Sequence, residues 1–245
     1  MTPGPPDPAP GGRGPILVTG SSGIVGRVVA AGLRERWDIR GVDRSLPGDP
    51  LIPTQAVDLS EPGALDPHLR GVDAVIHLAA SASPQAPWEK VLPNNIVATR
   101  GVFESCALAG VRRVVFASST HVLGLYERDE PYRSIVEGRT QRLDPAAVPR
   151  LTVDTPPRPD GYYGVSKLFG EDLGRYYAGT RGLQVACLRI GWVLEDDAPR
   201  TPRQRALYLS HHDLLRFVED ALTREPLTFD VRFALSDNRW RFHAL

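Results

Sequence analysis

The sequence predicts a doubly wound α/β fold, in which helices cover both faces of a parallel sheet. Short apolar runs alternate with helical patterns, and a glycine-rich turn joins the first run to the first helix. Two helical segments, 94–109 and 162–180, are each long enough to cross over a parallel sheet. A chain of 245 residues is ordinary for one such domain. We therefore expect a single domain over residues 15–245.

The first expected element is a strand at residues 16–19, a short apolar run that suits burial on both faces of a sheet. A helix is expected from residue 24 to 36, because apolar side chains recur there at helical spacing. The segment Ser210–Asp213 resembles a capping box, which predicts a helix that begins at about Ser210. Further strands are expected at 38–42, 56–57, 74–78, 114–117 and 184–190.

Two stretches depart from this alternation. Residues 1–14 are rich in proline and glycine and lack an apolar run, so we interpret them as a disordered tail and not as a signal peptide or a membrane span. Residues 127–159 are charged and rich in proline, and they are too long for an ordinary connection. We expect them to form an excursion on the substrate side of the site. From about residue 192 we expect a small C-terminal substrate-binding portion.

The composition favours a small molecule as the partner, and we expect a cytoplasmic location. The 29 basic and 29 acidic side chains cancel, which leaves no net field to gather nucleic acid or an anionic membrane. Cys106 and Cys187 lie far apart in apolar stretches, so we expect buried, reduced thiols. Because neither these cysteines nor any pair of histidines has metal-ligand spacing, no metal site is expected.

A glycine-rich turn, Gly20-x-x-Gly23-x-x-Gly26, follows the first strand and opens the first helix. In this context Gly20 permits the tight turn, Gly23 lets the backbone approach a pyrophosphate, and Gly26 allows close packing of the helix. The free N–H groups at the start of the helix can bind the anion. The sequence therefore predicts a Rossmann dinucleotide site.

Asp43 stands at the end of the second expected strand, where a carboxylate can accept hydrogen bonds from both adenosine ribose hydroxyls. The same carboxylate would repel a 2′-phosphate. Arg44, beside it, could tolerate that phosphate. We expect NAD in preference to NADP.

Tyr163 and Lys167 lie four residues apart in an expected helix, so the phenol and the ammonium share one face. A free phenol, with a pKa of about 10, is a poor base at neutral pH, but a nearby cation favours the phenolate and lowers that pKa. The chain otherwise uses arginine, apart from Lys90, and a compact ammonium can bind ribose hydroxyls and approach the phenol. We expect Tyr163 to accept a hydroxyl proton.

Ser118, Ser119, Thr120 and His121 directly follow an expected strand, so their side chains should project at the carboxyl end of the sheet, where such folds bind ligands. We expect Ser119 to hydrogen-bond the reacting oxygen. Ser118 can instead satisfy backbone groups at the end of the strand, and His121 can be a packed histidine, so their roles stay open. His77, at the end of its own strand, is interpreted as structural.

Four motifs follow one another along the chain, namely Thr19-Gly20-x-x-Gly23-x-x-Gly26, His77-Leu78-Ala79-Ala80, Phe116-Ala117-Ser118-Ser119 and Tyr163-x-x-x-Lys167. Together they resemble the extended short-chain dehydrogenase/reductase family, which includes sugar epimerases and dehydratases. Within it, the chain is most similar to uronate dehydrogenases, through the blocks Val115–His121, Arg158–Lys167, Leu188–Gly191 and Ser210–Asp213. Those enzymes oxidise the anomeric carbon of a hexuronic acid to an aldaric lactone with NAD.

The resemblance implies roles for individual residues. Catalysis would fall to Tyr163, Lys167 and Ser119, and Arg203 would bind the uronate carboxylate. NAD would be bound by Gly20, Ser22, Gly23, Ile24, Val25, Asp43, Asp58, Leu59, Leu78, Ala79, Ala80, Asn95, Ser118, Tyr163, Lys167 and Ile190. The sugar would be bound by Ser81, Ser83, Ser119, Thr120, His121, Tyr163, Trp192 and Arg203. Family members commonly form homodimers or higher homo-oligomers through the two long crossover helices, which implies the same here.

The chain departs from the family pattern at four places. Thr120 stands where the family usually has Asn, and Trp192 stands where it usually has a small hydroxylated residue, so a bulky indole would reshape the pocket. The stretch 127–149 is longer than the corresponding family loop, and the sequence stops short of the usual final helix.

Two alternatives to a uronate dehydrogenase stay open. The first is an epimerase, dehydratase or ketoreductase acting on a sugar or nucleotide-sugar with tightly bound NAD(P). The second is a non-catalytic NAD-sensing protein, against which the complete set of Tyr163, Lys167 and Ser119 argues. A hydrolase has no support, because the sequence holds no Gly-x-Ser-x-Gly elbow.

Overall fold

The computed structural model describes residues 14–46 and 48–245, so the predicted tail, apart from Gly14, lies outside the described residues. Within them, a parallel sheet of seven strands runs in the order β3-β2-β1-β4-β5-β6-β7. Its strands are β1 (Ile16–Thr19), β2 (Ile39–Asp43), β3 (Thr54–Ala56), β4 (Ala74–His77), β5 (Arg113–Ser119), β6 (Gln184–Ile190) and β7 (Phe229–Ala234). The predicted α/β fold with a doubly wound parallel sheet is confirmed.

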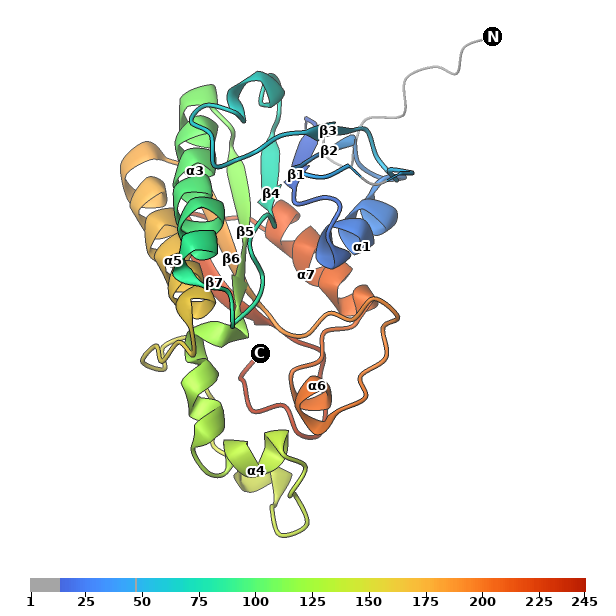
Figure 1. Cartoon of the computed structure of the whole chain (residues 1–245), viewed down its shortest axis with the longest axis vertical. Helices are drawn as coiled ribbons and strands as arrows, with labels where there is room; N and C mark the ends of the chain where they lie inside the picture. The colour runs from blue at the N-terminus through green and yellow to red at the C-terminus, as the bar shows by residue number, and fades with distance from the viewer. Residues whose placement is uncertain (1–13, 47) are drawn as a thin grey trace.

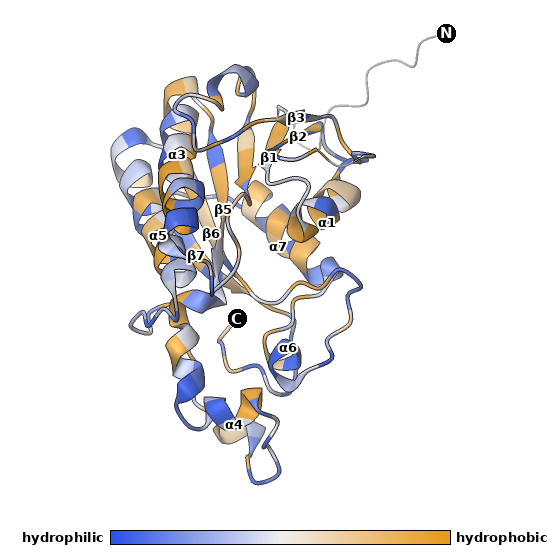
Figure 2. Cartoon of the chain, in the orientation of Figure 1, coloured by the Kyte–Doolittle hydropathy of each residue, from blue (hydrophilic) through white to orange (hydrophobic). Residues whose placement is uncertain are grey.

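Helices cover both faces of the sheet (Figure 1). α1 (Ile24–Leu33) and α7 (His211–Thr223) pack on one face, and α3 (Ala98–Ala109) and α5 (Tyr162–Arg181) pack on the other. Successive side chains of a strand point to opposite faces, so Ile16 and Val18 of β1 join the first core while Leu17 joins the second. Apolar residues fill the strands between the helices, as Figure 2 shows.

A third apolar cluster lies below the carboxyl end of the sheet. It is built from η3 (Thr120–Arg128), α4 (Tyr132–Val136) and α6 (Pro202–Ala206), with the buried side chain of Phe242 from the end of the chain. A short 3-10 turn, η4 (Pro145–Ala147), lies in the same excursion. The excursion and the C-terminal portion, which are far apart in the sequence, therefore pack together (Figure 1).

Several element boundaries differ from those predicted. The helix expected at 94–109 begins earlier, since α2 (Trp88–Val91) runs into the π-helix η2 (Leu92–Val97) and then into α3. β3 begins two residues before the expected strand at 56–57 and ends at Ala56. A 3-10 turn, η1 (Asp66–His68), precedes β4. The start of this helix was not predicted, because proline at position 93 and the π-helical turn interrupt the spacing of apolar residues that is typical of an α-helix.

The sequence prediction missed β7, which pairs in parallel with β6 at the edge of the sheet. Its residues alternate between apolar and charged, and only the last two are buried, so it lacks the continuous apolar run of a central strand. The helix predicted at Ser210 is confirmed, but the capping box there is only half formed. The Ser210 hydroxyl accepts the N–H of Asp213 at 3.1 Å, whereas the Ser210 N–H donates to the Ser236 hydroxyl.

Candidate active site at the carboxyl end of the sheet

A cavity of about 1070 Å³ opens where the strands β1, β2, β4, β5 and β6 end. This is the edge at which doubly wound sheets bind ligands. The residues predicted for the cofactor and the substrate line this cavity with two exceptions, Asn95 and Ser83. Motifs that are far apart in the chain therefore line one cavity, as the sequence predicts.

The glycine turn lines this cavity. Gly20 has φ +72°, a left-handed conformation that favours glycine, and a Cβ on Gly26 would lie 2.3 Å from the Gly20 carbonyl oxygen. Gly23 begins α1 without a side-chain cap, so the first N–H groups of the helix are free to bind an anion. The turn has the shape and the donors that a pyrophosphate requires.

Asp43 lies at the end of β2, beside this turn. Its carboxylate accepts the backbone N–H of Ser22 at 2.9 Å and that of Ser45 at 3.2 Å, which fixes its orientation at the cavity wall. Arg44 lies next to it, and its guanidinium donates to the amide oxygen of Asn94 at 2.9 Å. The fixed carboxylate and the tethered arginine are consistent with a ribose that carries free hydroxyls.

Tyr163 and Lys167 project into the cavity from α5, where the Lys167 ammonium lies 5.5 Å from the centre of the Tyr163 ring. The prediction that Lys167 lowers the pKa of Tyr163 is wrong for the protein alone. Burial raises the pKa of Tyr163 to about 12, although a hydrogen bond with Ser119 opposes this rise. Burial also lowers the pKa of Lys167 to about 7. Burial is the largest cause of both shifts, and the Asp160 charge adds to the rise at Tyr163.

Ser119 and His121 line the cavity at the end of β5. The Ser119 hydroxyl accepts the backbone N–H of His121 at 3.2 Å and hydrogen-bonds the Tyr163 side chain. The His121 imidazole meets the Tyr163 ring edge-on, with 5.6 Å between ring centres. Its Nδ1 atom lies 2.7 Å from a carboxylate oxygen of Asp160. His121 is therefore held by Asp160 at the wall of the cavity, and its contact with a sugar stays a prediction.

Ser118 and His77 have structural partners. The Ser118 hydroxyl donates to the carboxylate of Glu171, which also accepts two hydrogen bonds from Arg189, each at 2.9 Å. The ring nitrogens of His77 contact the hydroxyls of Thr19 and Thr99 at 2.7 and 3.1 Å. The interpretation of His77 as structural is confirmed by this buried position between two strands and α3.

Asn95 is one of the two predicted residues that do not line the cavity. The π-helix η2 turns its side chain inward, where it accepts the N–H of Ser81 at 2.8 Å and donates to the Ser166 hydroxyl at 2.9 Å. Ser166 in turn donates to the Tyr163 carbonyl. Asn95 therefore braces the helix turn that carries Tyr163. Ser83, the other exception, is exposed and bonds Gln85.

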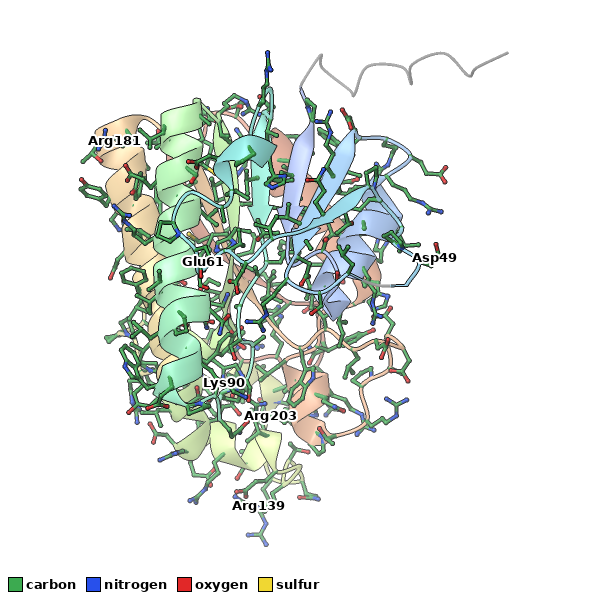
Figure 3. The ribbon with its side chains drawn as sticks, turned by 45° about the horizontal axis from the view of Figure 1, so that its top comes forward. Asp49, Glu61, Lys90, Arg139, Arg181 and Arg203 are labelled. Carbon is green, nitrogen blue, oxygen red and sulfur yellow. The ribbon has the colours of Figure 1, made fainter. Side chains whose placement is uncertain are left out.

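The α6 end of the cavity, which we define by Trp192, Arg203 and Leu207, lies over the third apolar cluster. Arg203 is labelled beside α6 in Figure 3, while Arg139, which lies in the excursion, is labelled at the lower end of the molecule. The Arg203 guanidinium lies 5.0 Å from the Trp192 ring centre and forms an ion pair with Glu127. The sequence analysis missed Glu127, because no local pattern connects it with a residue 76 positions away.

No helix among residues 14–46 and 48–245 is long and apolar enough to cross a bilayer. In the same part of the chain, no cluster of three or more histidine, cysteine, aspartate or glutamate side chains could hold a metal ion. The two cysteines are free and buried, as predicted. The cytoplasmic location and the homo-oligomer stay predictions.

Comparison with known proteins places this site in a family. Residues 16–195 match the NAD dependent epimerase/dehydratase family. An L-arabinose 1-dehydrogenase (NAD(P)(+)) from Haloferax volcanii is 38% identical over 92% of this chain and 90% of its own length. An NAD-dependent glucose-6-phosphate dehydrogenase from the same organism is 32% identical over 94% of this chain and 88% of its own.

A solved structure shows the same architecture. It is a mutant uronate dehydrogenase from Agrobacterium tumefaciens complexed with NAD, and it is 30% identical with a TM-score of 0.78 over 94% of this chain and 80% of that one. These findings confirm the predicted resemblance, the fold and the nicotinamide cofactor. The chain therefore belongs to the NAD dependent epimerase/dehydratase family, as a dehydrogenase of the extended short-chain type.

Proposed function

We propose that the protein oxidises the anomeric hydroxyl of a cyclic sugar to a lactone, with NAD as the hydride acceptor. One observation carries this proposal: Tyr163, Lys167 and Ser119 line the same cavity as the glycine turn of α1. A dinucleotide on that turn and an alcohol at Tyr163 would share one space. The names of the two curated relatives, both sugar dehydrogenases, support a sugar as the substrate.

The reaction removes a proton and a hydride from one carbinol group. The hydroxyl proton passes to the Tyr163 phenolate, the C–H bonding pair leaves as hydride, and the carbon–oxygen double bond of the lactone forms. When bound, NAD accepts that hydride. Ser119, which already hydrogen-bonds the Tyr163 side chain, orients the oxygen that loses its proton. Tyr163 then releases the proton to solvent.

Lys167 and Asn95 support Tyr163 in different ways. The buried Lys167 ammonium lies on the same helix face as the phenol and favours its ionised form once polar ligand groups enter the cavity. Asn95 holds the backbone of the same helix turn through Ser166. Loss of Lys167 would therefore change proton transfer, whereas loss of Asn95 would change the position of the phenol.

The substrates named for the relatives differ in charge. Arabinose is neutral, whereas glucose 6-phosphate and uronates are anions. A hexuronate, the substrate predicted from the sequence, stays a prediction, and Arg203 is the residue expected to bind its carboxylate. The partners of Arg203 therefore bear directly on the choice of substrate.

The test is turnover of a sugar panel by the purified protein with NAD. The panel holds L-arabinose, D-galactose, D-galacturonate, D-glucuronate and glucose 6-phosphate, with NADH absorbance as the readout and NMR to identify the lactone. The proposal requires NADH and lactone from at least one sugar. A lack of NADH across the panel, with cofactor that survives desalting on the protein, would instead support the epimerase or dehydratase alternative.

A further inference from the structure

The Arg203 guanidinium is engaged on one edge by a carboxylate of the protein itself. Its Nε atom lies 2.5 Å from one carboxylate oxygen of Glu127, and its Nη2 atom lies 2.9 Å from the other. This is the side-on, bidentate geometry in which arginine binds a carboxylate most strongly. Glu127 lies near the end of η3, in the excursion, and Arg203 lies on α6, so the pair also joins these two elements.

Both side chains of this pair are largely removed from water. Arg203 is 27% exposed and Glu127 is 15% exposed, and Arg203 alone of the two lines the cavity. Glu127 therefore lies behind Arg203 as seen from the cavity. Separating a pair of this kind would leave a partly buried carboxylate without its cation, which is strongly unfavourable.

The charge of Arg203 also acts on a second carboxylate, that of Asp160. Burial raises the pKa of Asp160, but its hydrogen bond and charge attraction with His121, with a smaller contribution from the Arg203 charge, hold that pKa below its ordinary value. The charge of Arg203 at the α6 end of the cavity therefore acts on two carboxylates that lie outside the cavity lining, those of Glu127 and Asp160. Lys90 also lines the cavity, but its helix turn is tied through Asn94 to Arg44 at the end of β2.

We infer that Glu127 is a specificity residue that makes this protein a dehydrogenase for a neutral sugar and not for a hexuronate. This inference rests on the proposed function. Glu127 occupies the guanidinium edge that a uronate carboxylate would use, and Nη1 of Arg203 is left to donate to a sugar hydroxyl. Trp192, which is 36% exposed, offers an apolar ring beside it for the C–H face of the sugar.

Electrostatics decides between the two substrates. A carboxylate that approaches Arg203 also approaches Glu127, and like charges a few ångströms apart repel each other at this partly buried position. A hydroxyl at the same place accepts a hydrogen bond from Arg203 without that repulsion. The specificity therefore comes mainly from repulsion of the uronate carboxylate, and less from tighter binding of the neutral hydroxyl.

The experiment uses sugars that differ only in the group on the fifth carbon. L-Arabinose, D-galactose and D-galacturonate share the configuration of ring carbons two to four, and they carry hydrogen, hydroxymethyl and carboxylate on the fifth. D-Xylose, D-glucose and D-glucuronate form the same series for the gluco configuration. With NAD, the unaltered protein is expected to show kcat/KM at least about tenfold higher for a neutral sugar than for the uronate of its series.

The variant is Glu127→Gln, which removes the charge but keeps the shape and an oxygen that can accept from Arg203. We expect the ratio of kcat/KM for the neutral sugar to kcat/KM for the uronate to fall by about tenfold or more, mainly through a lower KM for the uronate. Glu219→Gln is the matched control, since Glu219 also pairs with an arginine, Arg36, but neither residue lines the cavity, and it should leave the ratio unchanged.

A second readout separates this inference from the proposed function. The complex with NADH cannot turn over, so calorimetric titration with D-galactose and D-galacturonate measures sugar binding alone. Tighter binding of the uronate by Glu127→Gln supports the role of Glu127 even if no sugar is oxidised, an outcome that would overturn only the proposed function. Oxidation of uronates in preference to neutral sugars, or an unchanged ratio in Glu127→Gln, would overturn the inference and leave the proposed function standing.

Discussion

The ammonium nitrogen of Lys167 lies 5.5 Å from the centre of the Tyr163 ring, one helical turn along α5. Lys167 is only 4% exposed, while Tyr163 lines the cavity and is partly exposed to it. Because both side chains project from one helix face, an alcohol that reaches the phenol also lies near the ammonium. In the proposed mechanism, proton transfer depends on this pair.

Replacing Tyr163 with phenylalanine should remove the base and leave the cavity intact. We expect kcat/KM of Tyr163→Phe to fall by about a hundredfold or more, with unchanged affinity for NAD in a fluorescence titration. The control is Tyr162→Phe, because Tyr162 is the neighbouring residue on the same helix but is 53% exposed. If both variants kept full activity, another group would have to be the base.

The dependence of kcat/KM on pH should report the ionisation of Tyr163. Burial raises the pKa of this phenol to about 12 and its hydrogen bond with Ser119 lowers it, so activity should rise with pH as the phenolate forms. In Ser119→Ala the hydrogen bond is lost, the pKa rises further, and the ascending limb of the profile should move to higher pH. Thr180→Ala, at the exposed far end of α5, should leave the profile in place. A shift to lower pH in Ser119→Ala would contradict this assignment.

The carboxylate of Asp43 should determine the affinity for NAD. In Asp43→Asn we expect KM for NAD to rise by about tenfold or more, because a charge-assisted hydrogen bond to the ribose is weakened. The preference for NAD over NADP should fall as well, since the repulsion of a 2′-phosphate is removed. Asp38→Asn, just before the same strand and paired with Arg40, serves as the control. Unchanged constants for both cofactors in Asp43→Asn would show that the ribose lies elsewhere.

Acid should destabilise the protein through its buried neutral histidines. Burial, with a contribution from the Lys167 charge, lowers the pKa of His77 from 6.5 to about 3. The unfolded chain therefore binds a proton at this residue in a pH range where the folded protein does not. The free energy of unfolding should fall between pH 6.5 and about 3, by up to about 1.4 kcal/mol per pH unit from this group.

Urea unfolding at several pH values measures this effect. His77→Gln keeps a polar side chain between Thr19 and Thr99 but does not titrate, so its unfolding free energy should depend less on pH in that window. His212→Gln, at an exposed position on α7, should keep the pH dependence of the unaltered protein. A His77→Gln variant with an unchanged pH dependence would show that His77 does not stay neutral when the protein folds.

The central strands could be predicted from the sequence because burial on both faces produces continuous apolar runs, as at β1 and β5. The edge strand β7 could not be found in this way, since an exposed edge needs apolar residues on one side only. Its alternation of apolar and charged residues is a signal of period two, which a search for half-buried strands would detect.

The residues of the candidate site also differ in how far the sequence could predict them. The glycine turn and the Tyr163–Lys167 pair are local patterns, so their spacing alone predicts their chemistry. The pair of Glu127 and Arg203 depends on how the excursion packs against α6, and side chains 76 positions apart carry no local signal of contact. The pKa of Tyr163 likewise depends on burial by the whole fold, which explains why the spacing of Tyr163 and Lys167 predicted the wrong direction.

Transfer of deuterium from the sugar to the cofactor tests the central claim most directly. A neutral sugar that carries deuterium on the anomeric carbon is incubated with the protein and NAD, and the reduced cofactor is analysed by mass spectrometry. We predict NADH that carries the deuterium, together with the lactone and a slower rate than with the unlabelled sugar when hydride transfer limits turnover. NADH without deuterium, or retention of the label in a sugar of altered configuration, would contradict oxidation at the anomeric carbon.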